Sequence, residues 1–131
     1  EKVLAILPFF HVYGMTTVLI LSIMKGHEMI ILPKFDAITT LKTIQKQKPT
    51  LFPGAPTMYI GLLNHPDISK YDLSSIDACI SGSAALPVEV QEKFEKLTGG
   101  KLVEGYGLTE TSPVTHANLL WNEKRVKGSI G

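Results

Sequence analysis

Short, mainly apolar runs alternate with helical patterns along this chain, and the alternation constrains the fold more than any other feature of the sequence. Pro or Gly stands at or directly after the end of each run, and the runs lie at 3–7, 28–32, 50–53, 76–81 and 101–107. Continuous apolar runs of four to eight residues are typical of strands that are buried on both faces of a parallel sheet. The segments between them are therefore expected to be the helices that cover those faces.

The intervening segments carry helix start and stop signals. The expected helices are 13–25 with Gly26 after it, a helix capped by Asp36 and ended by Pro49, a helix around 56–64, and one that starts at Pro87 and stops at Gly99. Strands and helices in this order predict an α/β fold: a layered, Rossmann- or flavodoxin-like parallel sheet with helices on both faces.

Composition excludes several classes of protein. The net charge is +1 and the basic residues are interspersed with acidic ones, which argues against a nucleic-acid binder. Cys79 is the only cysteine, so an intramolecular disulfide and a cysteine-rich metal site are excluded, and its apolar surroundings predict a buried thiol. The stretch Val3–Met24 has no charged residue, but Pro8 and Gly14 interrupt it, and we do not expect it to span a membrane.

Three segments with polar and glycine residues follow strands of the expected sheet. They are PFFHVYG after the first strand, SGSAAL after the fourth and GYGLTE after the fifth. The carboxyl ends of parallel strands meet at one edge of a sheet, where ligands of such folds bind. The topology therefore predicts that these three loops form one binding site.

The stretch GYGLTE has the glycine spacing of a nucleotide-binding turn, but Glu110 stands where a dinucleotide fingerprint has its third glycine. Thr109 can donate to a phosphate oxygen, whereas the Glu110 carboxylate repels a bare phosphate. A Mg²⁺ ion between carboxylate and phosphate removes the conflict, so the turn suits a metal–nucleotide complex. The alternative is an ordinary turn in which Thr109 or Glu110 satisfies local backbone amides.

The other two loops are less specific. SGSAALP can pack against adenine or cradle phosphate at the start of a helix, and an ordinary tight turn explains it equally well. A lone histidine such as His11 is more often structural than catalytic, and the other histidines show no metal-ligand spacing with it.

Taken together, LPFFHVYG, SGSAAL, GYGLTETSP and the final GSIG resemble the consecutive core motifs of the acyl-adenylate-forming, AMP-binding enzymes. That superfamily includes acyl-CoA synthetases, peptide-synthetase adenylation domains and beetle luciferases. The segments TLFPGAPTMYIGLLNHP and KLVEGYGLTETSPVTHANL most resemble the corresponding segments of bacterial long-chain fatty acid–CoA ligases. The resemblance implies that residues 1–131 are one partial domain, the central part of the AMP-binding N-terminal domain, without its upstream phosphate loop and its C-terminal lid domain.

The resemblance implies a two-step reaction. A fatty carboxylate attacks the α-phosphate of Mg-ATP to give acyl-adenylate and pyrophosphate, and the thiol of CoA then displaces AMP. The implied partners are a long-chain fatty acid, ATP, CoA and Mg²⁺, in cytoplasmic fatty acid metabolism, with peripheral membrane association and oligomeric state left open. We expect the isolated 131 residues to be inactive, because the family's phosphate loop, ribose-binding Asp and catalytic Lys have no counterpart among them. A domain that loads a carrier protein and a non-catalytic nucleotide-binding module are the alternatives.

The resemblance also implies roles for individual residues. Glu110 would bind magnesium, Thr109 would contact phosphate, and His11 would lie near the substrate carboxylate and the CoA tunnel. The residues implied to contact the nucleotide are Gly82, Ser83, Ala84, Glu104, Gly105, Tyr106, Gly107 and Thr109. Those implied to line the substrate pocket are His11, Val12, Tyr13, Met15, Pro113 and Val114.

The sequence departs from the family pattern at two places. Many relatives have a second glycine followed by Ala-Pro where this chain has Ser83, Ala84 and Ala85. Many also carry an amide side chain at the position of Glu104, although a carboxylate can accept a hydrogen bond from the amino group of adenine.

Overall fold

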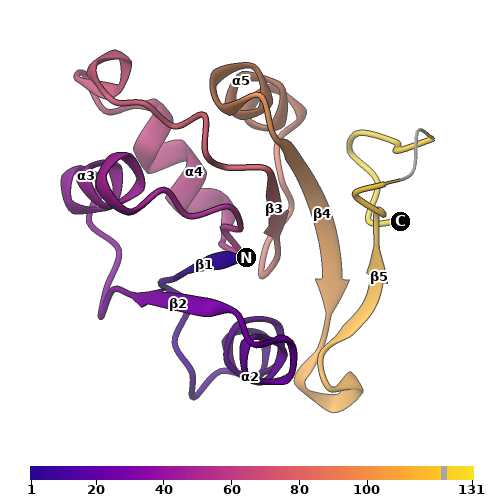
Figure 1. The fold of residues 1–131 in the computed structure, drawn as a ribbon. Coiled ribbons are helices and arrows are strands. Elements are labelled where there is room, and N and C mark those ends of the chain that lie inside the picture. Colours follow the sequence, from indigo (N-terminus) through magenta and orange to yellow (C-terminus); the bar gives the residue numbers. More distant parts are fainter. Residues whose placement is uncertain (122–123) are drawn as a thin grey trace.

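A computed structural model describes residues 1–121 and 124–131. Two pairs of parallel strands form its central sheet (Figure 1). Strand β1 (Lys2–Ala5) pairs with β2 (Glu28–Ile31), and β3 (Ala78–Ser81) pairs with β4 (Lys101–Gly107). Leu51 bridges the two pairs, since it is in register with Val3 on one side and Ala78 on the other. The predicted parallel sheet is confirmed, but the run at 50–53 contributes isolated bridges instead of a full strand.

The helices lie close to the expected positions. Their bounds are Val12–Gly14 (α1), Met15–Ile20 (η1, a π-helical turn), Leu21–Lys25 (α2), Ala37–Gln47 (α3), Pro56–Leu63 (α4) and Val88–Thr98 (α5), with short 3₁₀ turns at Ile68–Lys70 (η2) and Thr109–Thr111 (η3). Asp36 caps α3 as predicted, because its Oδ2 accepts from the backbone N–H of Thr39 at 2.9 Å. Pro87 is the N-cap of α5 and not its first residue, a shift of one position.

The helix predicted over 13–25 is continuous from Val12 to Lys25, but its middle turn is wider than an α-helix. The hydroxyl of Thr17 donates to the carbonyl of Tyr13 at 2.7 Å, which competes with the regular backbone ladder of the helix. Gly26 ends the segment with a φ of 66°, as the sequence predicts. Among the described residues, no helix is long and apolar enough to cross a bilayer.

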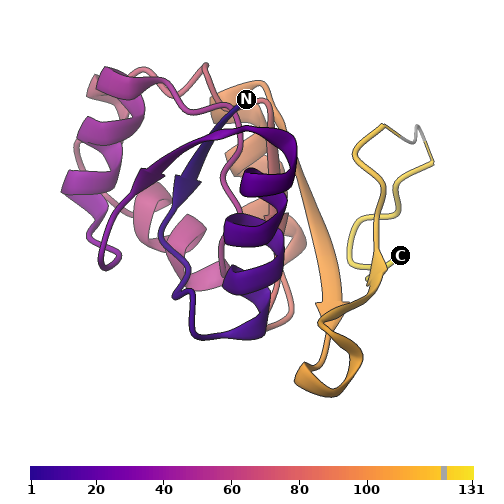
Figure 2. The same ribbon diagram turned by 60° about the horizontal axis from the view of Figure 1, so that its bottom comes forward.

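Two apolar clusters cover the two faces of the sheet. Leu4 and Ile6 face a cluster that includes residues of α3, α4 and α5, whereas Val3 and Ala5 face a second cluster that includes Val18 of the η1 turn. Figures 1 and 2 show the same arrangement, with α3, α4 and α5 on one side of the strands and α2 on the other. Alternate residues of β1 thus contact opposite layers, which explains why this run is apolar without interruption.

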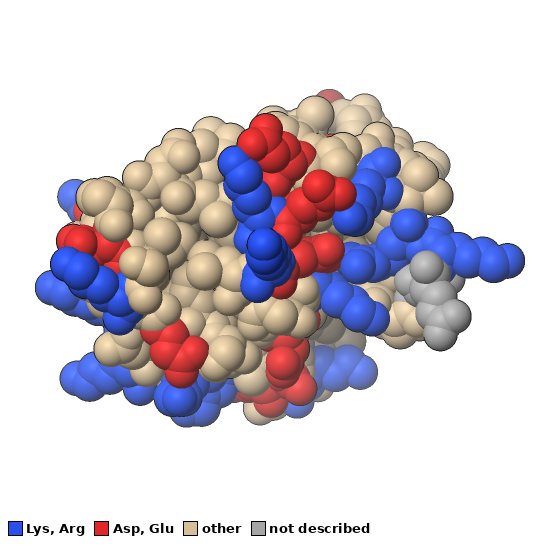
Figure 3. All heavy atoms as spheres, turned by 90° about the horizontal axis from the view of Figure 1, so that it is seen from above, with Lys and Arg blue, Asp and Glu red and all other residues tan. Residues whose placement is uncertain are grey.

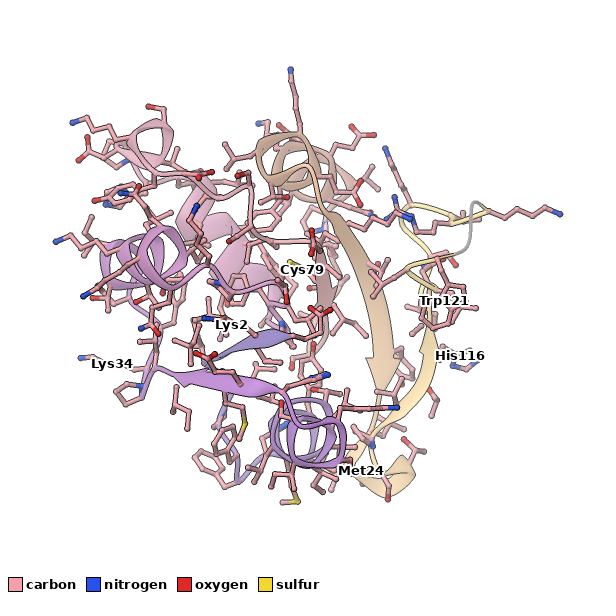
Figure 4. All side chains as sticks on the ribbon, viewed as in Figure 1. Lys2, Met24, Lys34, Cys79, His116 and Trp121 are labelled. Carbon is pink, nitrogen blue, oxygen red and sulfur yellow. The ribbon has the colours of Figure 1, made fainter. Side chains whose placement is uncertain are left out.

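The thiol of Cys79 lies inside the first cluster (Figure 4), and Cys79 is 2% exposed. Its burial raises the pKa of the thiol. The prediction of a buried thiol is therefore confirmed. In Figure 3 the two signs of charge are interspersed over the face seen from above.

Strand β4 is longer than its partner β3 and extends beyond the central sheet. Its first half pairs with β3, while Gly105–Gly107 pairs with β5 (Val114–Ala117) in the antiparallel direction. The sequence analysis did not predict β5, because its four residues are mostly exposed and show no apolar pattern. The β4–β5 hairpin places the GYGLTE turn at the carboxyl edge of the parallel strands (Figure 1).

Candidate functional site

The loops after β1, β3 and β4 meet in one pocket of about 320 Å³. Its wall consists of His11, Val12, Tyr13, Ile80, Ser81, Gly82, Ser83, Gly105, Tyr106, Gly107, Leu108, Thr109, Glu110, Pro113 and Val114. Segments that are up to about a hundred residues apart in sequence come together because they lie at or after the carboxyl ends of β1, β3 and β4, which share one edge. The expected convergence of these loops is confirmed.

His11 is fixed at the start of the helix that follows β1. Its Nδ1 accepts a hydrogen bond from the backbone N–H of Tyr13 at 3.2 Å, so the ring acts as the N-cap of α1. Since one nitrogen of a neutral imidazole accepts and the other donates, this contact assigns the proton of the neutral ring to Nε2. The exposed ring therefore offers a hydrogen-bond donor to a ligand in the pocket.

The loop after β3 is held closely against the rest of the fold. The N–H of Gly82 donates to the carbonyl of Gly54 at 3.1 Å. A Cβ on Gly82 would lie 3.0 Å from the ring of Tyr13, so a larger residue here would push the loop away from the ring. Ser83 has a φ of 75°, a left-handed conformation that turns the loop sharply.

The GYGLTE turn folds back tightly onto Pro113. Leu108 N–H donates to the carbonyl of Pro113 at 2.9 Å, and the hydroxyl of Thr111 lies 2.7 Å from the same oxygen. A Cβ on Gly107 would lie 2.2 Å from this carbonyl oxygen, which is far too close for any side chain. Gly107 is thus required by a close backbone approach within the turn.

Thr109 and Glu110 are exposed at the tip of this turn. The backbone amide of Leu108 is satisfied by Pro113 and by the hydroxyl of Thr111, to which it lies at 3.1 Å. No described amide of this turn donates to the side chain of Thr109 or Glu110, so the alternative that either satisfies local backbone amides is wrong. Among the described residues, neither of these two side chains forms a hydrogen bond or an ion pair within the chain.

The charge of the pocket wall favours a cation as part of the ligand. Among the described residues that line the pocket, Glu110 is the only acidic one, and there is no Lys or Arg. Within the described ranges, no group of three His, Cys, Asp or Glu side chains could enclose a metal ion. The residues present fit an ion such as Mg²⁺ that takes one protein carboxylate and completes its shell with phosphate and water oxygens.

Three of the residues predicted for the site lie outside the pocket wall. Ala84 is exposed farther along its loop, Met15 is 39% exposed on the η1 turn, and Glu104 is buried beside the loop after β3. Glu104 Oε1 accepts from the backbone N–H of Leu86 at 3.0 Å, so this carboxylate ties β4 to the start of α5. A direct contact between Glu104 and adenine stays a prediction.

The wall also contains residues to which the sequence analysis gave no role, namely Ile80, Ser81 and Leu108. The hydroxyl of Ser81 is buried and has no hydrogen-bond partner among the described residues. The sequence feature that could have identified Ser81 is a polar residue at the end of a buried strand, directly before Gly82.

We predict different outcomes for two substitutions of Glu104. Glu104→Gln keeps an oxygen that can accept from Leu86, so the free energy of unfolding should change little. Glu104→Leu leaves the Leu86 N–H buried without a partner and should lower the free energy of unfolding by about 1–3 kcal/mol. Urea unfolding of both variants tests this, and equal stability of the two would show that the Leu86 contact contributes nothing.

Comparison with known proteins gives consistent matches over the chain. The family described as AMP-binding enzyme matches residues 1–131. A long-chain-fatty-acid–CoA ligase of Bacillus subtilis (strain 168) is 70% identical over 131 residues, which are 100% of this chain and 23% of that protein. A probable 4-coumarate–CoA ligase of Dictyostelium discoideum is 40% identical over 115 residues, 86% of this chain and 21% of that protein.

Solved structures show the same similarity. The anthranilate CoA ligase AuaEII, crystallised in complex with anthranoyl-AMP, superimposes with a TM-score of 0.91 at 32% identity, over 100% of this chain and 25% of that one. A benzoate CoA ligase from Burkholderia xenovorans LB400 gives a TM-score of 0.89 at 25% identity, over 100% of this chain and 27% of that one. The chain thus spans about a quarter of the length of the proteins that it matches.

Proposed function

The chain belongs to the AMP-binding enzyme family, and we propose that the protein carrying it activates a long-chain fatty acid with ATP and transfers the acyl group to CoA. The observation that carries the proposal is the pocket in which the HVYG, SGS and GYGLTE segments meet. The 70% identity to a bacterial long-chain-fatty-acid–CoA ligase supports this choice of substrate. Because the chain is about a quarter as long as such relatives, the complete reaction is proposed for the full-length protein.

In the first step, a carboxylate oxygen of the fatty acid attacks the α-phosphorus of ATP, and the bond to the leaving pyrophosphate breaks. Thr109 would donate a hydrogen bond to a phosphate oxygen, and the Glu110 carboxylate would hold Mg²⁺. Mg²⁺ supplies the positive charge that offsets the phosphate charge and that the described pocket wall lacks. Positioning and charge neutralisation account for most of the catalysis in such a step.

The two glycine-containing loops hold the nucleotide. Adenine lies between Gly105–Gly107 on one side and Gly82 with Ser83 on the other, where glycines allow the backbone to approach a flat ring closely. Ala84 and Glu104 border this site from outside the pocket wall.

The segment after β1 receives the acyl substrate. Val12, Tyr13, Pro113 and Val114 line the pocket beside it, and Met15 follows on the helix. His11 donates from Nε2 to an oxygen of the substrate carboxylate, and it lies at the entry of CoA for the second step. There the sulfur of CoA forms a bond with the acyl carbon, and AMP leaves.

Acyl transfer by the full-length protein tests this proposal. The protein is incubated with a long-chain fatty acid, Mg-ATP and either free CoA or a phosphopantetheinyl carrier protein, and thioesters are identified by mass spectrometry. We expect acyl-CoA. Thioester on the carrier alone would indicate a carrier-loading domain, and nucleotide binding without either product would indicate a non-catalytic module.

The isolated 131 residues should not catalyse exchange between ATP and pyrophosphate. The described pocket wall has no Lys or Arg to share the phosphate charge, and the phosphate loop and catalytic Lys implied by the family lie outside these residues. Isotope exchange by the purified 131 residues would contradict this expectation.

A further inference from the structure

Two buried tyrosines donate hydrogen bonds to the same region of backbone. The hydroxyl of Tyr13 lies 2.8 Å from the carbonyl oxygen of Ile80 and 3.3 Å from that of Gly54. The hydroxyl of Tyr59 lies 2.8 Å from the carbonyl oxygen of Phe52 and 3.1 Å from that of Ile80. Tyr13 is 7% exposed and Tyr59 is fully buried.

The carbonyls that Tyr13 contacts lead directly to the loop after β3. The N–H of Gly54 donates to the carbonyl oxygen of Ile80 at 3.0 Å, and the N–H of Gly82 donates to the carbonyl oxygen of Gly54 at 3.1 Å. The Tyr13 hydroxyl therefore holds a set of backbone bonds that ends at Gly82. Burial raises the pKa of Tyr13, which keeps the hydroxyl protonated and able to donate.

The two tyrosines differ in what their rings contact. The ring of Tyr13 forms part of the pocket wall and supports Gly82, whose added Cβ would lie 3.0 Å from it. The ring of Tyr59 packs edge-on against Phe52 and Phe94, with centroid distances of 5.3 and 5.0 Å, inside the apolar core. Tyr59 does not contribute to the pocket wall.

We infer that Tyr13 is a positioning residue that fixes where the Gly82–Ser83 loop lies relative to the GYGLTE turn. It thereby sets the distance between the two sides of the nucleotide site. Its hydroxyl is bonded to the carbonyl of Ile80 near the end of β3, and its ring packs against Gly82. The contribution of Tyr13 to nucleotide binding therefore acts through Gly82. The inference rests on the proposed function only in assigning the nucleotide to this pocket. Its geometric part, the fixing of the loop by the hydroxyl, stands on the contacts of Tyr13 alone.

The test compares Tyr13→Phe with Tyr59→Phe in the full-length protein. Both substitutions remove one buried hydroxyl that donates to backbone carbonyls and leave the ring in place. In ATP–pyrophosphate exchange, Tyr13→Phe should raise the KM for Mg-ATP roughly three- to tenfold, as expected for the loss of one hydrogen bond, with a smaller change in kcat. Tyr59→Phe removes the longer contact to Ile80, at 3.1 Å, and none to Gly54, so it should lower the midpoint of thermal unfolding and change this KM less than Tyr13→Phe does.

Hydrogen exchange provides a readout that does not depend on activity. Backbone amides of residues 81–86 should exchange faster in Tyr13→Phe than in the wild type and in Tyr59→Phe. Equal exchange of this segment in the two variants, or an equal KM for Mg-ATP, would overturn the inference. A wild-type protein without exchange activity would refute the proposed function, while the amide exchange would still decide whether Tyr13 fixes the loop.

Discussion

Replacing Glu110 with Gln in the full-length protein is expected to lower the rate of ATP–pyrophosphate exchange by on the order of 10²- to 10³-fold. Glu110 is the only acidic residue in the described pocket wall, and none of the described side chains neutralises it. Gln keeps the size of the side chain but removes the charge that binds Mg²⁺. The exchange rate should therefore fall at the magnesium concentrations at which the wild type is assayed. Raising the magnesium concentration further should restore part of the rate.

A matched control is Glu89→Gln, another exposed glutamate, which lies on α5 away from the pocket and pairs with Lys93 at 2.6 Å. This variant should have wild-type kinetics and the same magnesium dependence. If Glu110→Gln behaves like Glu89→Gln, Glu110 does not bind the metal of the reaction.

Replacing Gly107 with Ala should reduce the same exchange activity by at least about tenfold through a change in backbone geometry. The new Cβ would lie 2.2 Å from the carbonyl oxygen of Pro113, and a backbone atom cannot move away as the end of a side chain can. The β4–β5 turn must open, and Thr109 and Glu110 at its tip would move with it. Steady-state kinetics should show a raised KM for Mg-ATP together with a lowered kcat.

Gly26→Ala serves as the control for glycine replacement in general. Gly26 has a left-handed φ of 66°, but an added Cβ there meets no atom within 4 Å, and the residue does not line the pocket. This variant should lose stability because Ala disfavours a positive φ, while its KM for Mg-ATP stays unchanged. Normal kinetics in Gly107→Ala would show that the closed form of the turn is not the one that binds nucleotide.

The layered α/β fold was predictable because its strands are buried on both faces. Alternate residues of β1 pack into two separate clusters, so an uninterrupted apolar run is required there, and Pro or Gly marks each end. Strand β5 was not predictable in the same way. It is held by pairing with β4 at the edge of the molecule, and backbone hydrogen bonds of this kind leave no pattern in the side chains.

The site was predictable at the level of loops more than of individual side chains. Topology alone brought His11, Gly82 and Gly107 into one pocket, because each lies at or after the carboxyl end of a strand and these ends share one edge. The hydrogen bond from Leu86 to Glu104 could not be read from the sequence, since it depends on how the loop after β3 turns back across β4. The same holds for the contact of Tyr13 with Ile80, which joins residues that are 67 positions apart.

The central claim is that this pocket supports adenylation of a fatty acid with Mg-ATP. Exchange of labelled pyrophosphate into ATP by the full-length protein measures that step directly, without CoA. The account predicts that label enters ATP only when a long-chain fatty acid and Mg²⁺ are both present. Exchange that proceeds without the fatty acid, or no exchange with any long-chain acid, would contradict it.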